Sequence, residues 1–263
     1  MLNYFLTANT SLQSIALTLL CLSFSLATLY ALRMIWPIES RPKILDIHGH
    51  MFGVIGIIYA VLVGAVAIGS WEKFNHGDVL VIREASIAMN IYNAAPGLGK
   101  GDVKEVQTFI KNYLENTIHN EWPKMQKNIS SDINEENITA LTKRLVQIDP
   151  KNKSQELYIP IVIQEVNSLR MIREERLFLA ETTLNTAILK LVFLGGFLTL
   201  LACIFLETES SKSHNAILLS ILSILIGLVL SAIIGLDHPF QGDLSISSRP
   251  LEAALSYINN AGN

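Results

Sequence analysis

The sequence predicts an all-α, multi-pass membrane protein with four transmembrane helices and a helical, water-exposed domain between the second and the third. The first observation behind this prediction is a set of four apolar runs, each long enough at about 1.5 Å per residue to cross the roughly 30 Å apolar core of a bilayer. The second is the charge distribution, because 14 of the 20 basic and 16 of the 23 acidic residues lie between residues 71 and 186. That segment is therefore expected to face water.

The four apolar runs define the spans. They are expected at residues 12–36, 51–70, 187–206 and 216–236. Their only charged residues are Arg33 and Lys190, each close to a span end, from where a long basic side chain reaches the interface. The stretch from Met1 to Leu32 has no charged side chain. It thus lacks the basic start of a secretory signal, and we expect no cleavage.

The spans divide the chain into five parts. These are residues 1–50 with the first span and a connecting loop, 51–71 with the second span, 72–186 as a helical cytosolic insert, 187–236 with the third and fourth spans, and 237–263 as a C-terminal tail.

Apolar residues at steps of three and four predict helices within the insert. One pattern runs from Val106 to Ile118, and a longer one runs from Gln155 to Glu181. The longer pattern carries Leu157, Ile161, Val166, Leu169, Ile172 and Leu179, and it is expected to lead almost directly into the third span. A further helix is expected to continue from the second span until Pro96 ends it.

Basic residues near the span ends indicate the orientation. Six lie on the side of the insert and both termini and four on the opposite side, which favours a cytoplasmic insert. The uncharged N-terminus favours the reverse, because such a segment is easily translocated. We expect the insert and both termini to be cytoplasmic.

A stripe of small residues follows the second span at helical spacing. It consists of Gly49, Gly53, Gly56, Ala60, Gly64 and Ala67. Small residues let helix backbones approach closely in lipid, so helix packing is one interpretation. The other is a pore-lining helix, whose opposite face would present Ile58, Leu62, Ala65 and Gly69. Both interpretations are compatible.

Two polar clusters could act in function. Arg170, Arg173 and Arg176 lie at steps of three before the third span and could attract anions to a vestibule, or simply form a solvated helix face. Asp46, His48 and His50 alternate in the expected loop before the second span. Without a further ligand at suitable spacing, they indicate interfacial polar residues more than a metal site.

The turn after the last span carries several distinctive residues. Pro239 cannot continue a helix, Gly242 permits a tight bend, and Phe240 is expected to pack at the interface. Asp237 ends the apolar run. We expect this motif to be structural.

The same turn resembles the C-terminal signature of the bestrophin-like family of bacterial membrane proteins, whose biochemical function is largely uncharacterised. The resemblance covers most of residues 50 to 256 and rests on these segments: Leu236–Ile246, Pro250–Leu255, Gly56 with Tyr59 and Ala60, Trp71-Glu72, Glu84-Ala85, Glu121–Met125 and Arg173–Leu177. It implies a multi-pass protein of the bacterial inner (plasma) membrane.

The bestrophin-like family is in turn distantly similar to bestrophins, which are pentameric anion channels with four spans and a helical cytosolic portion. The resemblance implies a homo-oligomer, pentameric if it follows bestrophins, and small inorganic anions as partners. Animal bestrophins bind calcium through several acids after the turn, whereas here only Asp243 directly follows Gly242. Calcium takes six to eight oxygen ligands, so we expect no metal and no other cofactor.

Two functional hypotheses remain. The first is a homo-oligomeric anion channel with an axial pore lined by the second span, and the alternative is a non-conducting membrane scaffold or sensor that acts through its helical insert. The nearly balanced charge of the insert argues against nucleic acid as a partner. The insert contains no nucleophile with an adjacent base, no phosphate-binding glycine loop and no convincing metal cluster, so we expect no enzymatic activity.

Overall fold

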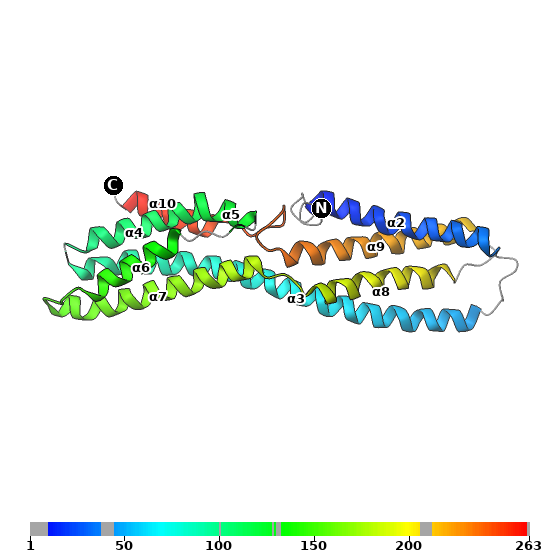
Figure 1. Cartoon of the computed structure of the whole chain (residues 1–263), viewed down its shortest axis with the longest axis horizontal. Coiled ribbons are helices and arrows are strands. Elements are labelled where there is room, and N and C mark those ends of the chain that lie inside the picture. The colour runs from blue at the N-terminus through cyan, green and yellow to red at the C-terminus, as the bar shows by residue number, and fades with distance from the viewer. Residues whose placement is uncertain are drawn as a thin grey trace. The chain divides into compact units, whose positions relative to one another are not determined.

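The chain is all-α, as expected. A computed structural model describes residues 10–37, 45–99, 101–127, 129, 133–205 and 212–261, and within these ranges it contains no strand (Figure 1). The helices are α2 (Thr10–Ile35), α3 (Leu45–Ala94), α4 (Val103–Asn116), α5 (Trp122–Gln126), α6 (Ile133–Val146), α7 (Lys153–Glu181), α8 (Thr186–Ile204), α9 (Lys212–Asp237) and α10 (Arg249–Ala261). A 3₁₀ turn, η2 (Ala95–Leu98), and a π-helical turn, η3 (Thr117–Glu121), connect some of them.

Four of these helices are long and apolar enough to cross a membrane. They contain the candidate spans Ser11–Ile35, Gly49–Leu98, Thr186–Ile204 and Ser213–Asp237. Each coincides with one predicted span, although the second helix begins at Leu45 and continues far beyond Ser70. It ends at Ala94 before Pro96, as predicted, because proline has no backbone N–H to donate.

The chain forms two compact units. The membrane unit comprises residues 1–73, 184–238 and 242–244, and the insert unit comprises 74–183, 239–241 and 245–263. Helix α3 therefore contributes its first part to one unit and its second part to the other.

A polar seam joins α2 to α9 in the membrane unit, where the two helices lie side by side (Figure 1). The hydroxyl of Ser223 donates to that of Ser25 over 2.7 Å, and the hydroxyls of Ser14 and Ser231 share a second hydrogen bond. Lipid supplies no competing partner for these hydroxyls, so each pair helps to hold the two helices together.

The backbones of α2 and α9 also approach each other closely between these two hydroxyl pairs. A Cβ added to Gly227 of α9 would lie only 2.6 Å from the Cα of Thr18 on α2. The missing side chain therefore permits the approach, as is typical of helix contacts in lipid.

The insert unit has an apolar core to which α3, α4, α6, α7 and α10 contribute. Its fully enclosed side chains include Ile91, Leu98, Ile110, Leu114, Ile138, Val162, Leu169 and Leu251. Helix α4 confirms the predicted pattern, since Val106, Ile110 and Leu114 are buried. Burying each such side chain stabilises the fold by about 1.5–3 kcal/mol.

Helix α7 matches the predicted range, but not every apolar residue of the predicted pattern lies on its buried side. Leu157 is 61% exposed and Ile161 is 40% exposed. The side chains that point inward are Gln155, Ile159, Val162, Val166, Leu169, Arg173, Arg176 and Ala180. This register follows i, i+3 and i+4 steps, and it places two arginines among apolar residues.

Capping side chains stand at the start of α7 and at the start of α8. The Asn152 side chain accepts a hydrogen bond from Gln155 N at the first turn of α7. The backbone at Thr182 is extended, which ends α7, and the Asn185 side chain then accepts from Ala187 N to begin α8. The long pattern thus leads almost directly into the third span, as expected.

Close contact at Gly227 gives a testable prediction. Gly227→Ala should lower the free energy of unfolding by about 1–3 kcal/mol, because the added methyl group collides with the Thr18 backbone. Val229→Ile is the control, since it adds one carbon to an exposed position of the same helix. Thermal unfolding of the detergent-solubilised protein measures both, and equal midpoints would contradict the assigned contact.

Candidate functional site

The predicted pore residues lie on a largely uncovered part of α3. Ile58 is 65% exposed, Ala65 and Gly69 are also exposed, and Leu62 is half-buried against the core of the membrane unit. Tyr59 instead packs against α8, where a Cβ on Gly195 would lie 2.8 Å from its ring. Leu62 therefore lies at the edge between the packed and the uncovered side of the helix.

The glycines of the small-residue stripe of α3 have no packing partner within the described part of the chain, whereas Ala67 of the same stripe packs against the core of the membrane unit. A Cβ added to Gly53, Gly56 or Gly64 would meet no atom within 4 Å. Packing inside one chain therefore does not account for these glycines.

The span of α3 differs from the other three in burial. None of its most apolar window is buried inside the chain, against 22% for α2, 28% for α8 and 39% for α9. This window has a mean hydropathy of 2.6. Helix α3 thus has more apolar surface left uncovered by the rest of the chain than the other three spans.

The three arginines of α7 do not share one environment. Arg170 is partly exposed, with its Nε 3.1 Å from Glu135 and an Nη donating to Thr139 over 3.0 Å. Arg173 is 3% exposed and Arg176 is fully buried. Neither of these two forms the solvated face that was one interpretation, and neither is open to ions from solution.

Arg176 bridges two buried carboxylates. Its Nε and one Nη donate to Glu84 over 2.6 and 3.1 Å, and the same Nη donates to Glu121 over 2.5 Å. Its other Nη contacts the Met125 sulfur at 3.2 Å, and its guanidinium carbon lies 5.6 Å from the centre of the Trp122 ring. The planar fork of arginine suits such bidentate contacts.

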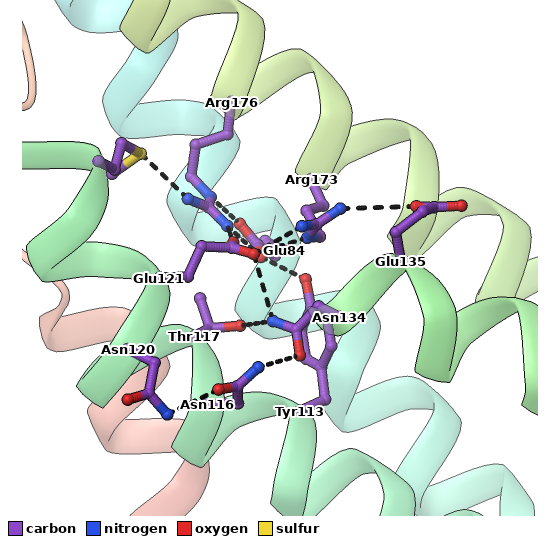
Figure 2. A network of polar contacts seen from close by, with 11 residues as sticks. Glu84, Tyr113, Asn116, Thr117, Asn120, Glu121, Asn134, Glu135, Arg173 and Arg176 are labelled. Carbon is purple, nitrogen blue, oxygen red and sulfur yellow. Dashed lines mark hydrogen bonds and ion pairs between the residues drawn. The ribbon is translucent and has the colours of Figure 1, made fainter. Parts of the chain in front are cut away.

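Arg173 completes the charge balance of this cluster. Its Nε and one Nη donate to the second oxygen of Glu121 over 2.9 and 2.7 Å, and its other Nη reaches Glu135 at 3.5 Å. Two enclosed guanidinium groups therefore face two enclosed carboxylates, those of Glu84 and Glu121. We call Glu84, Glu121, Arg173 and Arg176 the buried quartet; Figure 2 shows them converging from α3, η3 and α7.

Polar side chains around the quartet satisfy its remaining acceptors. Tyr113 donates to Glu84 over 2.5 Å, and Asn134 donates to Thr117 and Glu121 over 2.9 and 3.4 Å (Figure 2). Thr117 and Glu121 begin and end the π-helical turn η3, and both are buried. A π turn is rare and often occurs at functional sites.

Burial and charge shift two pKa values in this cluster. Burial, followed by the Glu84 carboxylate, raises the pKa of Tyr113 well above 10. Burial lowers the pKa of Arg176, but Glu84 and Glu121 raise it by more, so the net change is upward. Tyr113 therefore stays neutral and Arg176 stays charged at neutral pH.

The anion-vestibule prediction is wrong for Arg173 and Arg176, because both are enclosed and neutralised by carboxylates. Sequence reasoning missed the partners Glu84 and Glu121. A signal for Glu84 was present, since it follows Val81 and precedes Ala88 on the buried face of α3. A charge at an apolar position of a helical pattern indicates a buried ion pair.

The turn after α9 has a structural geometry. Asp237 is 1% exposed; its carboxylate accepts from Leu184 N over 3.0 Å at each oxygen and from Lys73 Nζ over 3.0 Å. Lys73 also donates to the Asp237 backbone carbonyl. This carboxylate joins the ends of three segments of the membrane unit.

The remaining residues of the turn belong partly to the insert unit. Phe240 is 1% exposed and packs edge-on against Trp122 at 5.8 Å between ring centres, so it lies in a protein core and not at a lipid interface as expected. The Pro239 carbonyl accepts a hydrogen bond from Ile246 N over 2.7 Å, and Gly242 has φ of 75°, which favours glycine.

The polar residues before the second span do not form the predicted loop. Asp46, His48 and His50 belong to the first turns of α3. The side chains of Asp46 and His48 lie outside the described part of the chain. Among the side chains that are described, no three His, Cys, Asp or Glu gather where a metal ion could bind.

Four spans, a helical insert after the second, and a signature turn after the last define a class of all-α membrane proteins. The family model of the bestrophin-like domain matches residues 19–251. The chain belongs to the bestrophin-like family.

Solved structures share the fold at low sequence identity. Two variants of a bacterial bestrophin homologue from Klebsiella pneumoniae match with TM-scores of 0.68 and 0.69 at 13% and 14% identity. The matches cover 94% of this chain and 98% and 97% of those chains. A crystal structure described as a membrane protein matches with a TM-score of 0.69 at 14% identity, over 94% of this chain and 96% of that one. No curated protein matches the sequence.

The buried quartet predicts a steep cost for losing one charge. Arg176→Ala should lower the free energy of unfolding by about 3–5 kcal/mol, because it leaves a buried carboxylate unpaired. Arg144→Ala removes a half-exposed arginine that pairs with Asp102 and Glu105, and it should cost about 0–1 kcal/mol. Thermal unfolding of both variants measures the contrast, and similar losses would contradict the quartet.

Alkaline pH should destabilise the fold through Tyr113. Because its folded pKa is raised, its contribution is complete below the unfolded value of about 10 and is lost as pH rises through the folded pKa. Tyr113→Phe should therefore weaken the fall of stability above pH 10. Unfolding midpoints across that range measure the effect, with Tyr257→Phe, at an exposed position, as the control.

Proposed function

We propose that the chain forms a homo-oligomeric anion channel whose axial pore is lined by the membrane part of α3. The observation that carries the proposal is the exposed apolar side of α3, whose most apolar window is 0% buried inside the chain. Its exposed large side chains include Met51, Val54, Ile57, Ile58, Val61 and Ile68. Several α3 helices around one axis would cover these side chains and give each glycine of the small stripe a partner.

An apolar neck suits this arrangement. Ile58, Leu62 and Ala65 would present aliphatic groups to the axis, and apolar constrictions can gate a pore by dewetting. Residues 49–70 contain no acidic side chain that would favour cations. Anion selectivity otherwise rests on the resemblance to bestrophins.

The arginines of α7 contribute less to anion attraction in this proposal than the sequence suggests. With Arg173 and Arg176 neutralised in the quartet, only Arg170 of the three remains partly exposed, and it already pairs with Glu135. We therefore assign ion preference to the neck and leave the arginines of α7 in a structural role.

The proposal includes the location and partners of the assembly. The chain would lie in the bacterial inner membrane with the insert and both termini in the cytoplasm, as a pentamer if it follows bestrophins. Its partners would be the lipid bilayer, further copies of itself and small inorganic anions, and it would not act as an enzyme.

A charge at the neck tests the proposal. Protein reconstituted in liposomes should pass chloride, and Ala65→Glu should shift selectivity towards cations because it places a ring of carboxylates in the pore. Ala65→Gln is the matched control, since it has nearly the same shape without the charge, and it should keep the anion preference. Reversal potentials in a salt gradient measure both variants.

Absence of flux in any salt, from protein that is correctly assembled, would overturn the channel. It would favour the alternative of a non-conducting scaffold or sensor that acts through its insert.

A further inference from the structure

The insert unit exposes apolar side chains that lipid does not account for, because most of this unit is a charged, water-facing domain. On α7 the outward face carries Met171, which is 68% exposed, and Phe178, which is 69% exposed. These two residues are seven positions apart and therefore lie on the same side of the helix, about 10 Å from each other. Their side chains therefore protrude from α7 in a row that runs along the helix axis.

A groove of about 500 Å³ opens elsewhere on the same unit. One wall is the second part of α3 and the other is α10. The lining residues are Ile82, Ala85, Ser86, Met89, Asn90, Pro250, Ala253, Ala254 and Tyr257. The lining is mainly apolar, and Ile82 and Tyr257 on its walls are 48% and 54% exposed.

The protruding residues and the groove have matching spacing. Ile82 and Met89 are also seven positions apart on one helix, so their separation equals that between Met171 and Phe178. A pair of equal helical repeats is what two helices need to interlock side chains along a line.

The protruding residues and the groove also lie at matching positions along the axes of α7 and α3; we call this position the height of a residue. Arg176 pairs with Glu84, which aligns these two positions of the antiparallel helices α7 and α3. Counting from that pair, Phe178 lies at the level of Ile82, and Met171 lies at the level of Met89. Rotation about an axis parallel to the helices keeps every residue at its own height, so the two surfaces would meet between neighbouring copies of a ring.

Charge supports the same pairing. Glu174 is exposed on α7 between Met171 and Phe178, and Arg83 is exposed on α3 beside Ile82. On the same height scale the two lie within one helical turn of each other. A carboxylate on one copy would thus face a guanidinium on the next.

We infer that Met171 and Phe178 of one copy dock into the α3–α10 groove of the next copy and close the ring on the cytoplasmic side. The contact is heterologous, because it joins two different surfaces, and repeated rotation of such a contact generates a closed ring. This inference rests on the proposed homo-oligomer and specifies the surfaces that hold it together outside the membrane.

Disulfide crosslinking between two chains of different size tests the contact. One chain carries Ser86→Cys and the other Met171→Cys, both in a background where Cys21 and Cys203 are changed to alanine, and the two are co-expressed. Oxidation should join the large chain to the small one in most of the crosslinked product. Met171→Cys with Lys104→Cys, an exposed position on α4, is the control and should give no such product.

The outcomes separate this inference from the proposed function. An oligomer of normal mass without the crosslink, or with crosslinks only between two Ser86→Cys chains, would overturn the docking contact and leave the channel proposal standing. A monomer by mass in mild detergent would overturn both.

A second variant tests the same contact without crosslinking. Phe178→Asp should release monomer from the detergent-solubilised oligomer, because it places a carboxylate in an apolar groove. Leu157→Asp, similarly exposed on α7 but far from the height of the groove, should leave the oligomer intact. Equal mass distributions for the two variants would contradict the inference.

Discussion

The buried quartet is the interaction on which the arrangement of the insert unit depends. Two arginines of α7 meet one glutamate of α3 and one of the π-helical turn, with all four side chains enclosed. Charges that have lost their hydration need partners in fixed geometry, so each helix is held in register by the others. Slipping α7 by one residue would rotate Arg176 away from Glu84 and leave unpaired charge in a dry core.

A second carboxylate plays a comparable part in the membrane unit. Asp237 closes α9, accepts from the backbone before α8 and pairs with Lys73 of α3. Along the spans, by contrast, hydroxyl pairs and close backbone contact join α2 to α9. Lipid offers these groups no competing hydrogen bonds, whereas apolar side chains gain little by leaving lipid for a neighbouring helix.

The exposed apolar side of α3 differs from the surfaces of the other spans, which are partly covered inside the chain. The other three spans bury 22–39% of their most apolar windows inside the chain, while the corresponding window of α3 is 0% buried. The insert unit also has uncovered apolar surface. It consists of the exposed side chains of Met171 and Phe178 and of the groove beside Ile82. Both features suit the proposed assembly, in which further copies of the chain would complete its packing.

The sequence by itself determined the class, the four spans, the helical insert and the family, because long apolar runs and the signature turn are local patterns. It also predicted where α3 ends, since proline acts within a few positions, and the range of α7, since apolar residues at helical steps are a local pattern. Only the tertiary structure decided which face of α7 is inside. Arg173 and Arg176 look like a solvated surface until Glu121, 52 positions from Arg173, and Glu84, 92 positions from Arg176, are brought within hydrogen-bonding distance. A partner so remote in sequence leaves no local signal on α7, because pairing between helices is a property of the folded core.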